Sequence, residues 1–325
     1  RMATQGHIRQ KLPHFANSTG GRWHLRVAHT GRSPCFFDLR LCCPQTRWAA
    51  DNKGSVIHSA NEEFQHPMTK VPTPVNDYWM DARKPLSCLL FLIPWIAIYE
   101  VGVLMLADRD PDRLRNGADY WMRSLLSLAG LGQVLLLPVF VVGVLLTWHI
   151  IRKHPWQVRL ETQVGMLAES FLLAVALVAA GQVHHLLFLN LHPTAVDARL
   201  LTLATGNLTR AVSFIGAGVY EEVMFRLLLV PLAFMAFRMF EFPKKWAAVM
   251  AAVTTAFVFA LAHHVGPNAD AFNLFTFSFR AVAGVFFAAI FFLRGFGITV
   301  GCHAAYDLLV GVFLAASAVE PTGSG

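Results

Sequence analysis

Long apolar runs, which begin at residue 86 and continue almost to the end of the chain, are the feature that most constrains how this sequence folds. A helix that crosses a bilayer needs ~20 predominantly apolar residues, because its backbone must satisfy its own hydrogen bonds inside lipid. Runs near that length occur at about 86–107, 128–151, 164–189, 209–238, 246–264, 272–293 and 296–316. This pattern predicts an all-α fold, a polytopic transmembrane helical bundle.

The fourth run is long, and it contains residues that interrupt helices. Gly216, Gly218 and Pro231 lie within it, and glycine and proline weaken or bend a helix interior. The run therefore fits either one helix or a short helix followed by a longer one. We expect seven to eight membrane helices.

The charged residues divide the chain into two parts. Only 14% of the residues are charged, against ~25% in an ordinary soluble domain. Residues 1–85 hold 12 of the 27 Lys and Arg but only 6 of the 20 Asp and Glu. We expect residues 1–80 to be a polar, disordered leader and residues 81–320 to form the transmembrane domain.

The basic residues indicate membrane orientation and not nucleic-acid binding. They are scattered through the leader and lie at the ends of apolar runs, for example Arg83 and Lys84 before the first run and Arg152 and Lys153 after the second. Cytoplasmic loops are enriched in Lys and Arg. These positions predict a multi-pass integral membrane protein with a cytoplasmic N-terminus and no nucleic-acid partner.

Two adjacent glutamates and an arginine lie inside the fourth run, where charge costs ~2.5–3.5 kcal/mol per residue even on the lenient insertion scale. Around an ideal helix, Arg226 lies ~40° from Glu222 but ~140° from Glu221. Glu222 and Arg226 therefore form an i,i+4 pair, which leaves Glu221 available for chemistry. A buried ion network without catalysis is the structural alternative.

Later runs add His263, His303 and an aspartate to the candidate residues. The fifth run ends FVFALAHH, in which Phe259 and His263 share one helix face. In the seventh run His303 and Asp307 share a face, and the glycines at the two ends of 297–301 permit another helix to approach closely. Each histidine alone is compatible with a structural role.

Glu221, His263 and His303 come from three different runs, and together they suggest a hydrolytic site. A carboxylate hydrogen-bonded to histidine takes a proton from water as a general base. One glutamate and two histidines are also a ligand set for catalytic zinc. The residues by themselves leave both interpretations open.

Three motifs give these residues a specific resemblance. EEVMFR fits EExxxR, FALAH fits FxxxH, and HAAYD fits HxxxN or HxxxD, in that order and within apolar runs. In this respect the chain resembles the CPBP family of CAAX proteases and bacteriocin-processing proteases, also called Abi proteins. The resemblance covers a protease-like core at about 164–316.

The resemblance implies a role for each matching residue. Glu221 matches the glutamate that activates the hydrolytic water, and His263 matches the residue that helps to hold that water. Glu222 and Arg226 match the supporting ion pair. His303 matches a residue placed near the scissile carbonyl oxygen.

Asp307 departs from the commoner pattern, in which asparagine ends the third motif. An asparagine amide donates a hydrogen bond to an oxyanion, whereas an ionised aspartate only accepts. Asp307 therefore either carries a proton or orients His303.

The same residues bear on the choice between water and zinc. The guanidinium of Arg226 disfavours a divalent cation nearby, so we expect a glutamate-activated water with no obligatory cofactor. Zinc bound by Glu221, His263 and His303 is the alternative.

The expected function is an intramembrane endopeptidase that hydrolyses a peptide bond of a membrane-associated protein or peptide. The alternatives are a catalytically inactive CPBP-like scaffold or immunity protein, and a transporter, which also keeps paired charges near the bilayer midplane. Two further charged residues lie in apolar runs, Glu100 and Arg280; we expect each to have a structural role, and a pair between them is one option, because such groups usually pair with one another.

Overall fold

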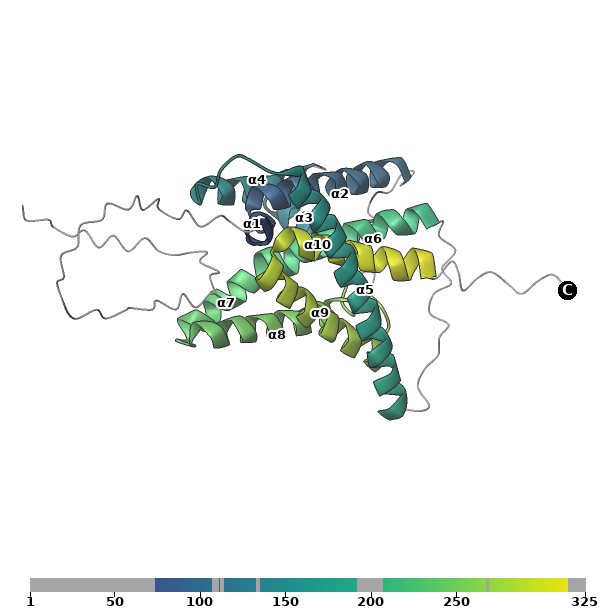
Figure 1. Cartoon of the computed structure of the whole chain (residues 1–325). Coiled ribbons are helices and arrows are strands. Elements are labelled where there is room, and N and C mark those ends of the chain that lie inside the picture. The colour runs from purple at the N-terminus through teal and green to yellow at the C-terminus, as the bar shows by residue number, and fades with distance from the viewer. Residues whose placement is uncertain are drawn as a thin grey trace, which may run out of the picture. The chain divides into compact units, whose positions relative to one another are not determined.

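The structure, a computed structural model, describes residues 74–106, 111, 114–132, 135–191, 207–266 and 269–314, so nearly all of the predicted leader lies outside the described residues. These parts of the chain are helical and contain no strand. Figure 1 shows the arrangement of the helices. The α-helices are α1 (Pro74–Asp81), α2 (Pro85–Leu106), α3 (Gly117–Leu128), α4 (Leu136–Ile151), α5 (Leu160–Leu191), α6 (Asn207–Glu222), α7 (Val230–Met239), α8 (Lys244–Ala262), α9 (Leu274–Arg294) and α10 (Phe296–Leu308), and π-helical segments are η2 (Val223–Leu229) and η3 (Leu309–Leu314).

The prediction of an all-α membrane bundle is confirmed. Four of the described helices are long and apolar enough to cross a membrane, at Pro85–Leu106, Leu160–Leu189, Lys244–Ala262 and Leu274–Arg294. Shorter apolar helices occupy Leu136–Ile151 and Phe296–Val312. The number of seven to eight spans stays a prediction.

Apolar side chains on the outside of the bundle support a lipid environment. Leu104 of α2 is 57% exposed, Leu172 of α5 is 68% exposed and Val253 of α8 is 51% exposed. Soluble proteins rarely expose large contiguous apolar surfaces, whereas lipid solvates them. The chain is accordingly an integral membrane protein.

One predicted boundary was wrong. The run at 128–151 is not a single helix, because α3 ends at Leu128 and α4 begins at Leu136. Gly130 adopts a φ of 76°, the left-handed conformation with which glycine ends many helices.

The fourth run continues through a π-helical segment and does not divide at its glycines. Gly216 and Gly218 instead permit close contacts: a Cβ on Gly216 would lie 2.0 Å from the Tyr99 ring, and one on Gly218 would lie 2.6 Å from the backbone nitrogen of Ala304. Pro231 lies in the first turn of α7, directly after the π-helical segment.

Helix α10 forms the centre of the core and packs against α5, α6, α9 and α2 (Figure 1). Residues 296–304 are all buried, as expected for a helix that is surrounded on every side. The close approach predicted for the glycines of 297–301 is present, since a Cβ on Gly301 would lie 2.5 Å from Ser170 Oγ of α5. The core thus fixes α10 beside α6, which carries the two glutamates.

Helix α1 extends the ordered structure into the last residues of the predicted leader. The Tyr78 hydroxyl donates to Glu169 Oε2 of α5 at 2.6 Å, and the Arg294 guanidinium of α9 also binds Glu169. Burial of Asp81 opposes its ionisation, but Lys84 and Arg159 outweigh that effect and hold the pKa of Asp81 below its usual value. Helix α1 therefore overlaps the last residues of the stretch predicted to be the leader, and the leader boundary stays a prediction.

Replacing Gly218 with alanine tests the contact between α6 and α10. The added methyl group would meet the Ala304 backbone, which cannot move without shifting α10, so we expect Gly218→Ala to lower the free energy of unfolding by about 1–3 kcal/mol. Gly143→Ala is the matched control, because a Cβ there meets nothing within 4 Å. Unfolding in detergent measures the free energy of unfolding of both variants. Equal stability of the two variants would contradict the close packing of α6 on α10.

Candidate active site

The two glutamates lie at the junction between α6 and η2, and their surroundings differ. Glu222 is fully buried, and its Oε2 lies 3.1 Å from Nε of Arg226, as predicted from the i,i+4 spacing. Glu221 faces another direction, and its side chain keeps 13% of its surface exposed. The buried charge of one glutamate is balanced, whereas the other borders accessible space.

Arg226 connects three helical segments through its guanidinium. Its Nη2 donates to the Gly284 carbonyl of α9 at 3.2 Å. The guanidinium carbon lies 4.6 Å from the ring centroid of Phe259 on α8 and 5.3 Å from that of Phe287 on α9, within the range of cation–π attraction. A π-helical segment at such a site is a common feature of functional helices.

His303 of α10 lies between the two glutamates. Its Nδ1 is 2.7 Å from Glu222 Oε1, and because an ionised carboxylate only accepts, this nitrogen carries the proton. Its Nε2 lies 3.9 Å from Glu221 Oε2 and 3.5 Å from Asp307 Oδ2. The shared face of His303 and Asp307 is confirmed, but the bond to Glu222 was missed, because sequence spacing carries no information about contacts between distant helices.

His263 approaches Glu221 from the end of α8. Its Nδ1 lies 2.9 Å from the Phe259 carbonyl, and since a carbonyl accepts, the ring donates there. Its Nε2 is then free of that proton and lies 3.8 Å from Glu221 Oε2. The adjacent His264 points elsewhere, with its Nδ1 3.0 Å from the Asp270 carbonyl.

A cavity of about 80 Å³ opens beside Glu221 and His263. It is large enough for water, whose share of liquid volume is ~30 Å³. Its lining residues come from α3, the α6–η2 junction, the end of α8 and the loop that follows: Gly117, Ala118, Trp121, Glu221, Met224, Phe225, Ala262, His263, Val265 and Asp270.

The structure thus brings all six predicted site residues into one connected group, but only two of them line the cavity. Glu221 and His263 border the cavity directly. His303 touches Glu221 from the protein side, with Asp307 behind it. The predicted convergence of Glu221, His263 and His303 is present in the structure, and their roles in a reaction remain proposals.

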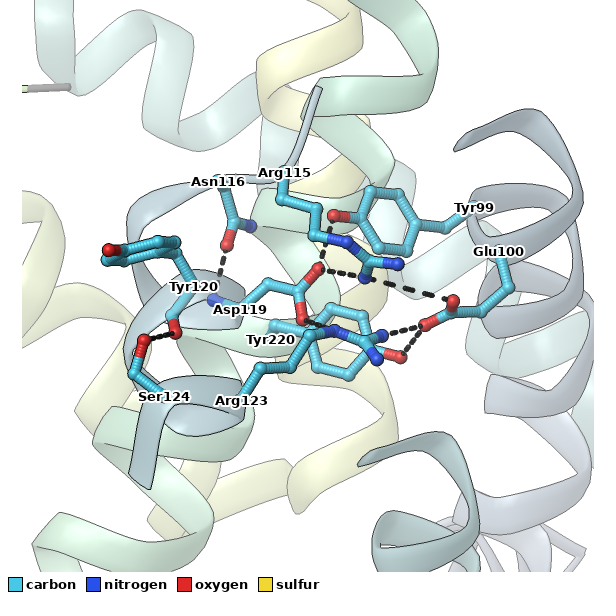
Figure 2. Close-up of polar contacts among 9 residues, drawn as sticks. All are labelled: Tyr99, Glu100, Arg115, Asn116, Asp119, Tyr120, Arg123, Ser124 and Tyr220. Carbon is cyan, nitrogen blue, oxygen red and sulfur yellow. Dashed lines mark hydrogen bonds and ion pairs between the residues drawn. The ribbon is translucent and has the colours of Figure 1, made fainter. Parts of the chain in front are cut away.

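The contribution of α3 to the cavity wall was not anticipated from the sequence. We define the α2–α3 charge cluster as Glu100, Arg115, Asp119 and Arg123 together with the hydroxyls of Tyr99 and Tyr220 (Figure 2). The sequence showed only that charged residues flank Gly117 on both sides, which does not place the segment beside the cavity.

The cluster also corrects the predicted pair of Glu100 with Arg280. Glu100 Oε1 accepts from Arg123 at 2.8 Å and from the Tyr220 hydroxyl at 2.5 Å (Figure 2). Arg280 instead binds Asp270 at 2.5 Å. The suggested pair is absent, because polarity and depth alone do not show which helices are neighbours.

A zinc ion requires three protein ligands with donor atoms ~2.0–2.2 Å from one point. Within the residues that the structure describes, no group of three His, Cys, Asp or Glu side chains is arranged to hold a metal ion. The guanidinium of Arg226 beside Glu222 also adds positive charge near Glu221. The residues as placed do not fit a zinc site.

The chain thus brings a glutamate and two histidines from separate apolar helices together beside a cavity that accommodates water. Residues 204–309 match the family model described as Rce1-like: Type II CAAX prenyl endopeptidase Rce1-like. This segment contains all six predicted site residues. The match supports the CPBP and CAAX-protease family for this part of the chain, and a peptidase in general terms. No curated protein and no solved structure matches the chain.

The buried ion pair at the site has a measurable effect on stability. Arg226→Ala leaves the Glu222 charge buried without its guanidinium partner, and breaking such a pair costs ~3–5 kcal/mol. Arg238→Ala, on the exposed end of α7, is the matched control and should change the free energy of unfolding by less than about 0.5 kcal/mol. Denaturant titration in detergent compares them, and a similar small loss for both would mean that the pair does not support the fold.

Proposed function

We propose that this chain is an intramembrane endopeptidase that hydrolyses a peptide bond of a membrane-associated protein or peptide. The observation that carries the proposal is the position of Glu221 and His263 on the wall of one cavity, with their side chains 3.8 Å apart. A water in that cavity would lie within reach of a carboxylate base and of an imidazole nitrogen without a proton.

In the proposed reaction, Glu221 takes a proton from this water while His263 Nε2 orients it. The water oxygen forms a bond to the scissile carbonyl carbon, and the carbonyl electrons move to its oxygen. When the intermediate collapses, the carbon–nitrogen bond breaks and Glu221 returns the proton to the leaving nitrogen. The products are one carboxylate and one amine.

The remaining residues support this cycle from the protein side. Glu222 accepts from His303 Nδ1 and so fixes the ring against Glu221. His303 is proposed to stabilise the charge that develops near the carbonyl oxygen, a role that requires the imidazolium form, in which Nε2 carries a proton as well as Nδ1. The contact of Asp307 with His303 at 3.5 Å favours an orienting role for Asp307 over direct donation to the oxyanion.

The substrate class follows from the family description and from the location of the site. The matched family model is named for CAAX prenyl endopeptidases, so prenylated C-terminal segments are the proposed first substrates. Peptide precursors and membrane-anchored regulators are the other proposed substrates. The cytoplasmic N-terminus predicted from the basic loops is part of the proposal.

Glu221→Gln tests the base directly. The amide keeps the shape of the carboxylate but takes no proton, so we expect hydrolysis to fall by about 10²–10⁴-fold, with little change in melting temperature. Glu161→Gln, an equivalent change on the exposed first turn of α5, should leave turnover unchanged. Cleavage of a lipidated peptide in detergent provides the assay.

Two results of that assay would decide against the proposal. Full turnover by Glu221→Gln would remove the assigned base. No turnover by the wild-type chain on any membrane-anchored peptide would favour the inactive scaffold, the immunity protein or the transporter.

Metal dependence is a separate prediction, because the residues as placed do not form a zinc site. We expect purified active protein to keep its turnover after treatment with a chelator and removal of the chelated ion. Elemental analysis of the same sample provides the control. Stoichiometric zinc whose removal stops turnover, and whose return restores it, would overturn the proposed metal-free mechanism.

A further inference from the structure

The α2–α3 charge cluster joins three helices through buried ionic contacts. Arg123 Nε lies 2.6 Å from Asp119 Oδ1, and Arg115 Nη1 lies 2.9 Å from Asp119 Oδ2 (Figure 2). The Tyr99 hydroxyl of α2 donates to Asp119 Oδ2 at 2.7 Å. Among the described residues, the cluster comprises two guanidinium groups and two carboxylates.

Helix α3 buries few of its side chains in the bundle. Its buried residues are Ala118, Asp119 and Met122, and Asp119 alone is fully buried, at 0% exposed. Asn116 caps its first turn by accepting from the Asp119 backbone N–H at 2.7 Å. Few apolar side chains of α3 are buried, and Asp119 and Arg123 link the helix to Tyr99 and Glu100 of α2.

The other face of α3 borders the active-site cavity. Gly117, Ala118 and Trp121 line that cavity together with Glu221. The Trp121 ring also reaches the loop after α8, since a Cβ on Gly266 would lie 3.3 Å from it. Two residues apart on a helix, Asp119 and Trp121 point in directions ~160° apart, so the cluster and the cavity lie on opposite faces of α3.

A second connection runs to the proposed base itself. Tyr220 directly precedes Glu221 on α6, and its hydroxyl donates to Glu100 at 2.5 Å. The Tyr99 and Tyr220 rings meet edge to face, with centroids 5.3 Å apart. The same cluster therefore holds both α3 and the helix of Glu221.

We propose that α3 is a substrate-contacting wall of the active site and that the α2–α3 charge cluster positions this wall opposite Glu221. Trp121 contacts the bound peptide, whereas Tyr99, Asp119 and Arg123 are positioning residues that act through α3. The inference rests on the proposed protease function, which it extends to a region outside the three motifs.

Two matched tyrosine variants separate this role from general stability. Tyr99→Phe removes the hydroxyl that binds Asp119, and Tyr78→Phe removes the hydroxyl that binds Glu169 in a second ionic group that lies outside the cavity lining. Both keep the ring and its packing. We expect Tyr99→Phe to raise KM by about fivefold or more with kcat within about twofold, and Tyr78→Phe to leave both unchanged.

A double-mutant cycle with Trp121→Ala tests whether the effect passes through α3. Once the Trp121 side chain is removed, a displaced α3 should raise KM little further. The double variant should therefore have a KM close to that of Trp121→Ala alone. Independent effects would instead multiply. Multiplying KM effects, or an unchanged KM in Trp121→Ala, would overturn the inference while the protease function stands.

The wild-type chain in the same assay distinguishes failure of this inference from failure of the proposed protease function. Turnover by wild type with unchanged KM in Tyr99→Phe refutes the role of the cluster alone. No turnover by wild type refutes the proposed function, and the inference falls with it.

Discussion

The structure around the site depends on one buried carboxylate, that of Glu222, and on the two cationic or donating groups that satisfy it. Arg226 lies 3.1 Å away on the next helical turn, and His303 Nδ1 lies 2.7 Å away on another helix. A carboxylate buried in apolar surroundings is expensive unless it is paired and hydrogen-bonded. Because the two partners come from different elements, satisfying Glu222 also fixes how α6, η2 and α10 fit together.

In this arrangement one of two adjacent glutamates has a structural role, and the other is available for the proposed reaction. Glu222 faces inward and is fully buried, whereas Glu221 borders the cavity with His263. Gly218 makes the arrangement possible, since only a residue without a Cβ lets α6 approach the backbone of Ala304, next to His303. The packing of small residues thus determines the position of the proposed base.

The sequence predicted the features that depend on local spacing. The apolar runs predicted the all-α membrane bundle, and i,i+4 spacing predicted the contacts of Glu222 with Arg226 and of His303 with Asp307. Motif order predicted that residues from three runs converge. Each of these follows from the period of a helix or from the cost of polar groups in lipid.

Features that depend on which helices are neighbours were not predicted. Glu100 was paired with Arg280, but it binds Arg123 and Tyr220 instead. The cavity wall formed by α3 was not predicted for the same reason. The spacing of Asp119 and Trp121 does not indicate that Asp119 faces a charge cluster and Trp121 a cavity.

The central claim, that Glu221 activates a water that attacks the peptide carbonyl directly, is tested most directly by a single turnover in ¹⁸O-labelled water with enzyme in excess. Direct attack by water places the label in the new carboxylate of the peptide product and not in the Glu221 side chain, and mass spectrometry of both molecules measures it. Label in the Glu221 carboxylate would show that this residue attacks the substrate itself, and it would contradict the account.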